Sequence, residues 1–373
     1  MKPYIKYTGG KYREYTSFKN FIPKEINNYY EPFLGGGGVF FRLHEEKIIK
    51  NLSFLNDKSK DLMEFYSSIK EPNFINELNL LNNVWNELKL ISDNIIEIYG
   101  KEFLVKVLSK EKSTIFNNSV FINIINHFIN DGEYIKSYDF FGVDLVNQIS
   151  LSLSDKLNRF SNKNISESET DLIDDCIRTA IYQGFYFTLR EIYNKWLNDE
   201  NFNIEICKKS SIWLFIREFC FGGMFRFSNG KFNIPYGGKS YNNKCLKCKI
   251  DAISSDETKE LFEKVHLYCE DYETFLNRPF EEGDFIFFDP PYDSTFSEYD
   301  ELSFDKSEQV RLSEYVKTLK CKWMMVVRKT PLICELYKDY EMIEFDKTYM
   351  YNARGEYKDK KSKHIIIKNY AIE

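Results

Sequence analysis

The chain has 373 residues, of which 29% are charged and 43% hydrophobic, as in ordinary globular proteins and unlike disordered ones. The formal net charge of −6 argues against a uniformly basic nucleic-acid-binding surface, so a polyanion would have to meet a local basic patch. The sequence has no apolar run of membrane-spanning length and no signal peptide. Its eight cysteines are scattered along the chain, which favours reduced thiols over a disulfide framework. We therefore expect a cytoplasmic protein that makes no membrane contact.

Two glycine-rich turns are predicted near the start of the chain. Gly9 and Gly10 lie between two lysines, in a turn whose backbone can approach a ligand closely. A strand predicted at residues 28–33 runs into four glycines at residues 35–38, and a helix is expected to begin at about Val39. A strand, a glycine turn and a helix N-terminus together favour binding of a nucleoside or an acidic ligand, although four glycines can also form a plain flexible loop.

A second strand is predicted at residues 52–55, followed by a helix at residues 59–69. Asp57 follows this strand and lies about twenty residues beyond Gly37, where Rossmann-like folds bind ribose hydroxyls through an acidic side chain. Taken alone, Asp57 can equally be a cap at the end of the strand.

The middle of the chain, residues 71–255, differs in character. It is rich in Asn, Ile, Leu, Lys and Glu and has helical periodicity. The predicted helices span residues 74–90, 94–108, 170–198 and 210–221, and the polar residues 152–169 are predicted to be a loop. We therefore predict a large, mainly helical insertion.

A basic hairpin is predicted at residues 222–238, near the end of this insertion. Asn229-Gly230 is a strong turn signal between two aromatic segments. The basic residues around it follow one another with no acidic residue between them: Arg226, Lys231, Lys239, Lys244, Lys247 and Lys249. This interval is the local basic patch that the net charge lacks.

Alternating helices and strands resume after the insertion. Ser255 is predicted to cap a helix at residues 256–264, and Asp305 and Glu308 are placed as a capping box for a helix at residues 306–319. The predicted strands span residues 265–269, 284–288, 323–327, 342–345 and 364–368. The sequence therefore predicts an α/β protein whose Rossmann-like sheet is built from residues 1–70 and 256–373.

The apolar strand at residues 284–288 ends at Asp289-Pro290-Pro291-Tyr292, because neither proline can donate to a β-ladder. Ligands of open α/β sheets collect at the carboxyl ends of strands. There, the Asp289 carboxylate and the Pro290 carbonyl can each accept one N–H of a nucleobase amine, whose lone pair is otherwise delocalised into the ring. The Tyr292 ring can stack on the base. The alternative is a proline-rich turn with a solvated aspartate.

Five motifs in this order resemble those of the Dam-type, α-group adenine-N6 DNA methyltransferases. They are K-Y-T-G-G-K, E-P-F-L-G-G-G-G-V-F-F, L-N-D-K-S-K-D-L, F-R-F-S-N-G-K-F-N-I-P-Y-G and D-P-P-Y. A shorter match, F-T-L-R-E-I-Y-N at residues 187–194, is similar to a helix of that family; Arg190 and Glu191 in it can also be an exposed pair or a hinge. The resemblance is weak over residues 71–174.

The resemblance implies site-specific methylation of a flipped adenine in double-stranded DNA, with S-adenosylmethionine as cofactor and no metal. It implies cofactor binding by Tyr7, Gly9, Gly10, Lys11, Glu31, Pro32, Phe33, Gly35, Gly37, Asp57, Asp271 and Asp289. It implies catalytic roles for Asp289, Pro290 and Tyr292, and DNA binding by Arg226, Lys231, Asn233, Pro235, Lys239 and Lys244. A cognate restriction endonuclease is a further possible partner, and a monomer or weak dimer is expected.

The hairpin departs from the family pattern. Gly222 stands where Asn is common, and Arg226-Phe227-Ser228 replaces R-Y-N, which leaves the recognition sequence open. A cytosine-N4 methyltransferase, an inactive DNA-binding relative and a nicotinamide-dependent dehydrogenase are the alternatives. Zinc binding by Cys245 and Cys248 is disfavoured, because His266 and Cys269, three apart on a predicted strand, face opposite sides.

Overall fold

The computed structural model describes residues 1–371 except residue 8 and residues 110–117, 162–169, 292–303 and 349–360. The chain forms two compact units, one of Met1–Lys70 with Ser254–Glu373 and the other of Glu71–Ile253. The sequence suggested boundaries after residues 70 and 255. No helix in the described part of the chain combines the length and apolar character needed to cross a membrane.

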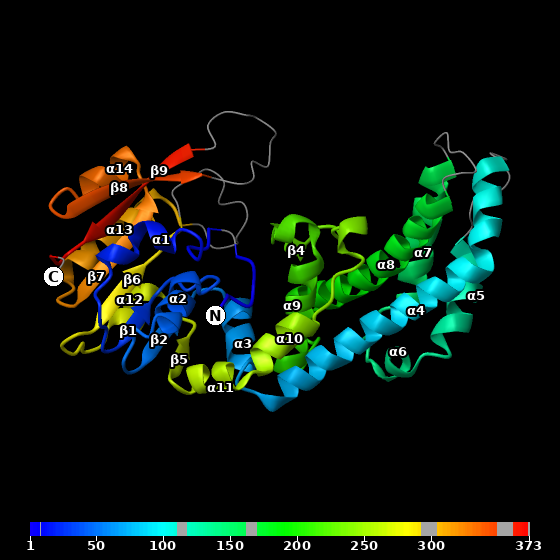
Figure 1. Cartoon of the computed structure of the whole chain (residues 1–373), viewed down its shortest axis with the longest axis horizontal. Helices are drawn as coiled ribbons and strands as arrows, with labels where there is room; N and C mark the ends of the chain where they lie inside the picture. Colours follow the sequence, from blue (N-terminus) through cyan, green and yellow to red (C-terminus); the bar gives the residue numbers. More distant parts are fainter. Residues whose placement is uncertain (8, 110–117, 162–169, 292–303, 349–360, 372–373) are drawn as a thin grey trace. The chain divides into compact units, whose positions relative to one another are not determined.

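A seven-stranded sheet organises the first unit (Figure 1). Its order is β5-β2-β1-β6-β7-β9-β8, parallel except that β9 runs antiparallel to both its neighbours. The strands are β1 (Tyr29–Glu31), β2 (Ser53–Asn56), β5 (Val265–Tyr268), β6 (Phe285–Phe288), β7 (Lys322–Arg328), β8 (Glu341–Thr348) and β9 (Lys361–Lys368). The α/β prediction is confirmed.

Helices cover both faces of the sheet because side chains alternate along each strand. Ile286 and Phe288 pack in one core with α12 (Tyr272–Leu276), α13 (Lys306–Thr318) and α14 (Pro331–Leu336). On the other face, Phe287 stacks on Phe18, the last residue of α1 (Tyr15–Phe18), with ring centroids 5.7 Å apart. The remaining helices of this unit are α2 (Gly38–Glu45), α3 (Lys60–Ser68) and α11 (Asp256–Glu263), with a 3₁₀ turn at Lys19–Phe21.

Two predicted helix caps are present, but one capping box is incomplete. The Ser255 side chain accepts from the N–H of Thr258, and Asp305 accepts from the N–H groups of Ser307 and Glu308. Glu308 was expected to complete the box. Its carboxylate instead accepts from Arg311 one turn later, because an Arg at i+3 offers a charged donor.

The second unit is mainly helical. Its helices are α4 (Pro72–Ser109), α5 (Asn118–Ile129), α6 (Glu133–Ser137), α7 (Leu145–Ser161), α8 (Thr170–Asn198), α9 (Ile206–Phe219) and α10 (Lys247–Ser254). Helices α4 and α7 both pack against α8 (Figure 1). Short 3₁₀ turns lie at Phe221–Gly223 and Lys239–Tyr241.

Two secondary-structure predictions in this unit, one of a helix break and one of a loop, were wrong. The helices expected at residues 74–90 and 94–108 are one helix. Residues 91–93 contain no Gly or Pro to end it, and the buried Ser92 hydroxyl is satisfied within the helix, by the carbonyl of Lys89. Of the loop predicted at residues 152–169, residues 152–161 are helical and the rest lie outside the described residues. In the helical part, the buried Leu153 and Leu157 lie four apart among serines and polar residues, which hid the apolar stripe.

The predicted hairpin is confirmed as β3 (Phe227–Ser228) and β4 (Lys231–Phe232), which pair antiparallel. Asn229 and Gly230 have φ values of 52° and 68°. Two consecutive positive φ values are those of a type I′ turn, whose twist matches that of the two strands.

Candidate active site

The acidic side chains singled out from the sequence follow adjacent strands of the sheet. Glu31 ends β1, Asp57 follows β2, Asp271 lies three residues beyond β5, and Asp289 follows β6 directly. Since these four strands are parallel, their carboxyl ends share one edge of the sheet. β1 and β6 are neighbours whose chain crossovers run to opposite sides, which is the switch point where open α/β sheets bind ligands.

The glycine turn brings the first motif against this edge. Gly37, the N-cap of α2, has a φ of 66°. Residues with a side chain rarely adopt this left-handed conformation. A Cβ on Gly38 would lie 2.6 Å from the backbone nitrogen of Tyr12, and one on Gly36 would lie 2.9 Å from the Cβ of Tyr7. The turn therefore needs glycine so that Tyr7 and Tyr12 can pack directly on it.

Asp57 ties the glycine turn to the next helix. Its carboxylate accepts from the N–H of Gly35 at 2.8 Å and from the N–H of Ser59, the N-cap of α3, at 3.0 Å. These bonds fix the side-chain orientation at the end of β2. They also show that the capping role considered from the sequence is real, whatever else Asp57 binds.

Glu31 is a buried carboxyl group with 2% exposure. Burial raises its pKa well above the ordinary value, and the nearby charges of Asp289 and Asp57 raise it further, against the hydrogen bond that it accepts from the Tyr29 hydroxyl at 2.9 Å. A positively charged ligand at this edge would favour the ionised form of Glu31.

Asp289 forms an ion pair with Lys11, at 2.5 Å between Nζ and Oδ1. The Lys11 side chain is only 1% exposed, and its ammonium also donates to the carbonyl of Gly9 at 3.2 Å. The sequence placed both residues in the site, but Lys11 only at the cofactor. The structure brings it to the Asp289 carboxylate, which links the first motif to the D-P-P-Y motif.

The D-P-P turn is anchored by a residue that the sequence did not single out. Gln309, fully buried on α13, donates from Nε2 to the carbonyl of Pro291 at 2.8 Å. Pro290 is a buried residue, and no hydrogen bond between described residues reaches its carbonyl. Tyr292 lies outside the described residues.

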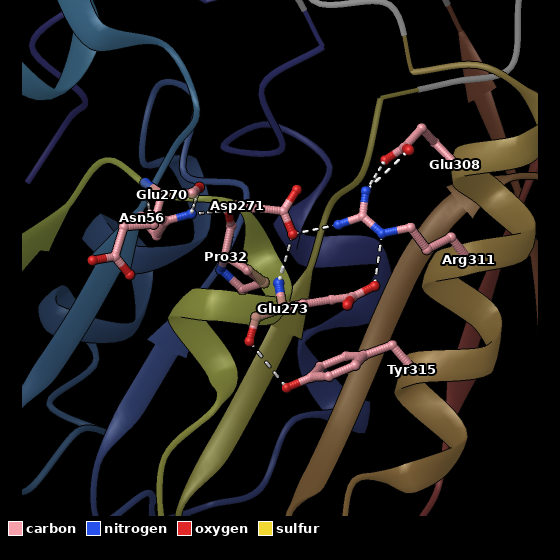
Figure 2. A network of polar contacts seen from close by, with 8 residues as sticks. All are labelled: Pro32, Asn56, Glu270, Asp271, Glu273, Glu308, Arg311 and Tyr315. Atoms are coloured by element: carbon pink, nitrogen blue, oxygen red, sulfur yellow. Dashed lines mark hydrogen bonds and ion pairs between the residues drawn. The ribbon is translucent and has the colours of Figure 1, made fainter.

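Asp271 lies in a charge network centred on Arg311 of α13 (Figure 2). Arg311 donates to Asp271, to Glu273 at 2.7 Å and to Glu308 at 2.8 Å. Burial alone would raise the pKa of Asp271, but the hydrogen bonds from Arg311 and from the N–H of Glu273 lower it below the ordinary value. The i, i+3 spacing of Glu308 and Arg311 was visible in the sequence, whereas the pairing across 40 residues was not.

Asn56 holds two strand ends together beside this network (Figure 2). Its side-chain amide donates to the carbonyls of Pro32 at 3.0 Å and Glu270 at 3.1 Å, and it accepts from the N–H of Glu270 at 2.9 Å. Asn56 was not predicted to be a site residue, because its neighbour Asp57 fitted the position of the ribose-binding acidic residue of Rossmann-like folds. Phe33, also in the glycine motif, packs its ring edge-on against Phe304.

The hairpin of the second unit presents one polar face. Residues alternate along it, so Phe232, Ile234 and Tyr236 are buried while Lys231, Asn233 and Pro235 are exposed. Arg226, also exposed, lies beside Asn233 and donates from Nε to its Oδ1 at 3.4 Å. Four of the residues predicted to bind DNA therefore share an exposed surface: Arg226, Lys231, Asn233 and Pro235.

The other two predicted DNA contacts have acidic partners within the unit. Lys239 pairs with Asp175, and Lys244 donates to the carbonyl and the carboxylate of Glu218. Glu218 is buried, and Lys249 also pairs with it, at 3.1 Å. The basic interval read from the sequence is thus partly neutralised by residues distant in the chain. Among the described residues, no group of three or more His, Cys, Asp or Glu side chains is arranged to hold a metal ion.

Comparisons with known proteins agree with these features. The family model for D12 class N6 adenine-specific DNA methyltransferase matches residues 7–93 and 146–351. The type II methyltransferase M.CviBI of Paramecium bursaria Chlorella virus NC1A is 32% identical over 57% of this chain and 83% of its own length. The type II methyltransferases M.MjaIII of Methanocaldococcus jannaschii and M1.LlaDCHI of Lactococcus lactis subsp. cremoris are 22% and 23% identical, each over 99% of this chain and 99% and 96% of their own lengths.

The family match covers more than half of the chain, and the mostly parallel sheet is consistent with the fold of S-adenosylmethionine-dependent methyltransferases. The dehydrogenase and cytosine-N4 alternatives are thereby set aside. The chain belongs to the D12 class of N6 adenine-specific DNA methyltransferases.

Proposed function

We propose that this adenine methyltransferase binds S-adenosylmethionine along the carboxyl ends of β1, β2 and β5 and accepts a flipped adenine at Asp289. The observation that carries the proposal is the position of Asp289. It follows β6 directly, beside the switch point, and its carboxylate is oriented by the buried Lys11 ammonium. Site-specific methylation is supported further by the three type II methyltransferases among the relatives.

The chemistry of the donor set fits this cofactor. When bound, S-adenosylmethionine supplies a methyl group on a positively charged sulfur. The strand ends offer carboxyl groups from Glu31, Asp57 and Asp271, which suit a cationic ligand that also carries ribose hydroxyls. Open space lies beside the first motif among the described residues, since a Cβ on Gly9 would meet none of their atoms within 4 Å. The glycine turns at Gly9-Gly10 and residues 35–38 would let the ligand approach the backbone.

The roles at the reacting end follow from the same geometry. Asp289 and the Pro290 carbonyl each accept one N–H of the adenine amine, which directs the nitrogen lone pair towards the methyl group. Lys11 orients Asp289. The C–N bond would form as the bond between the methyl group and sulfur breaks, leaving a neutral thioether. The amine would lose its proton, to solvent or to Asp289, as or after that bond forms, so no prior deprotonation is needed. Tyr292 stacks on the base in this proposal, which rests on the sequence motif for that residue.

Double-stranded DNA is the substrate, and the base must leave the helix to reach Asp289. We propose that the hairpin reads the major groove, with Arg226 suited to bidentate contact with guanine and Lys231 to phosphate contact. We further propose that the protein acts in the cytoplasm as a monomer or weak dimer. A cognate restriction endonuclease is its proposed partner.

Methylation of random DNA followed by mapping of the modified bases tests the site specificity. The matched pair Asp289→Asn and Asp339→Asn then tests the active site, because Asp339 is an exposed carboxylate outside it. Asp289→Asn should slow methylation by about 10²-fold or more while the dissociation constant for S-adenosylmethionine changes little. Asp339→Asn should match the wild type. Near-normal turnover of Asp289→Asn would overturn the assignment.

A further inference from the structure

Helix α8 holds the hairpin through a row of side chains spaced four residues apart. Asn198 donates to the carbonyl of Gly230 at 3.0 Å. Asn194 exchanges two hydrogen bonds with Phe232, donating to its carbonyl at 3.0 Å and accepting from its N–H at 2.8 Å. Arg190 and Tyr186 both donate to the carbonyl of Ile234, at 3.1 and 2.8 Å. We call these four side chains the α8 ladder.

The spacing of the α8 ladder has a physical reason. Residues four apart on a helix are separated by about 6 Å along its axis, and residues two apart on a strand by about 6.6 Å. A helix ridge of period four can therefore meet every second residue of a strand running alongside. The partners at positions 230, 232 and 234 fall at this interval, in reverse order to the helix residues.

The α8 ladder occupies the edge of β4 that β3 leaves open. Ser228 pairs with Lys231, and the N–H of Asn233 donates to the carbonyl of Arg226, so these residues of the β4 segment bond towards β3. The intervening residues bond outwards, where an edge strand would otherwise expose unpaired groups. Asn194 makes the same donor and acceptor pair that a neighbouring strand would make.

We propose that Asn194, with the rest of the α8 ladder, is a positioning element for sequence recognition. It fixes where the hairpin stands along α8, and thereby where Arg226 and Asn233 stand. A one-residue slip would turn their face inwards, and a two-residue slip would move it by about 6.6 Å. The inference rests on the proposed reading of DNA by the hairpin. It also gives Arg190 a role in place of the exposed pair or hinge considered from the sequence.

The test measures discrimination, as the ratio of kcat/KM for the mapped site to that for a site with one base pair changed. Asn194→Ala removes both bonds to Phe232, whereas Asn194→Asp keeps an acceptor for the N–H and places a carboxylate against the carbonyl. Both variants should lower discrimination about tenfold or more at the base read by Arg226. Loss of a single bidentate base contact has an effect of this size. Affinity for S-adenosylmethionine should stay unchanged. Gln183→Ala, which removes an amide elsewhere on α8, is the control and should match the wild type.

A double-mutant comparison separates positioning from general destabilisation. If Asn194 acts through Arg226, adding Asn194→Ala to Arg226→Ala should cause no further loss at that base. Additive losses would overturn the inference, as would normal discrimination by Asn194→Ala when Arg226→Ala has lost it.

Amide hydrogen exchange distinguishes failure of this inference from failure of the proposed function. If Arg226→Ala keeps full discrimination at every base pair of the site, Arg226 reads no base, and the proposed reading of DNA by the hairpin is wrong. Exchange at the N–H of Phe232 should still accelerate in Asn194→Ala and not in Gln183→Ala, which supports the α8 ladder itself. Unchanged exchange overturns it.

Discussion

At the scale of single residues, the site depends on charges that lie close together with little solvent. Lys11 is almost fully buried, and its charge is compensated by Asp289. Glu31 is buried beside two further carboxylates and has a raised pKa. A bound ligand that adds or removes a charge near Lys11, Asp289 or Glu31 should therefore change the protonation or the orientation of these side chains.

Lys11→Met tests whether Lys11 acts through Asp289 or directly on the cofactor. The substitution removes the ammonium and keeps most of the stem, so the Asp289 carboxylate loses the cation that orients it. We expect kcat to fall about 10²-fold or more, with a small change in the dissociation constant for S-adenosylmethionine. Calorimetry and single-turnover methylation measure the two effects. A large loss of cofactor affinity at normal single-turnover rate would instead assign Lys11 to the cofactor, as the sequence alone suggested.

Glu31 should make cofactor binding depend on pH. Its folded-state pKa is raised, so the group is protonated over a range above the ordinary pKa of glutamate. A cationic ligand favours the ionised form, so binding should release a proton and affinity should increase as pH rises through the raised pKa. Calorimetry in buffers of different ionisation enthalpy measures the proton release. Glu31→Gln should abolish it, and an unchanged pH profile in that variant would contradict the assignment.

At the scale of elements, α13 supports the site from two positions on one helix. Gln309 holds the Pro291 carbonyl and Arg311 connects Asp271 to α12 and α13. The helix itself was predicted from its cap and periodicity. Its function was not, because local pattern carries no information about partners 18 to 40 residues away in the chain.

Arg311→Met should weaken the cofactor site more than the fold. The Arg311 side chain is 37% exposed, so solvent screens its ion pairs and we expect a loss of only about 1 kcal/mol in the free energy of unfolding. The pKa of Asp271 is lowered in the folded state, so its contribution is present at neutral pH and is lost as pH falls through that lowered pKa. Urea unfolding at several pH values should show the difference between variant and wild type shrinking in acid, and a constant difference would contradict this linkage.

The same contrast between local and distant information runs through the other elements. Strands, the glycine turn and the type I′ hairpin were predicted because short segments determine them. The lengths of α4 and α7 were wrong because buried Ser92 and the stripe of Leu153 and Leu157 depend on packing. The α8 ladder was missed for this reason too, although its asparagines were visible in the sequence.

At the scale of the whole molecule, each compact unit contains one part of the proposed chemistry. The acidic strand ends belong to the unit of Met1–Lys70 with Ser254–Glu373, and the hairpin belongs to the unit of Glu71–Ile253. A net charge of −6 is compatible with DNA binding because exposed basic residues such as Arg226 and Lys231 gather on the hairpin face.

No metal is expected to take part in the reaction, because the sulfonium already activates the methyl group. Dialysis against EDTA should leave the initial rate of methylation unchanged. A loss of activity that zinc restores, and magnesium does not, would instead assign a function to the exposed Cys245 and Cys248.

The distribution of charge predicts different outcomes for two lysines of the basic interval. Lys231 is exposed on the hairpin face, so Lys231→Ala should weaken binding to all DNA sequences and reduce the slope of log affinity against log salt by about 1.

Lys244 instead compensates the buried Glu218, which has a side-chain exposure of 4%. Removing one partner of a buried pair costs roughly 3–5 kcal/mol, and Lys249, which remains paired with Glu218, should keep the loss below that. Lys244→Ala should therefore lower the free energy of unfolding and leave the salt slope intact, as urea titration and DNA binding at several salt concentrations would show. A reduced slope with normal stability would mean that Lys244 leaves Glu218 to bind phosphate.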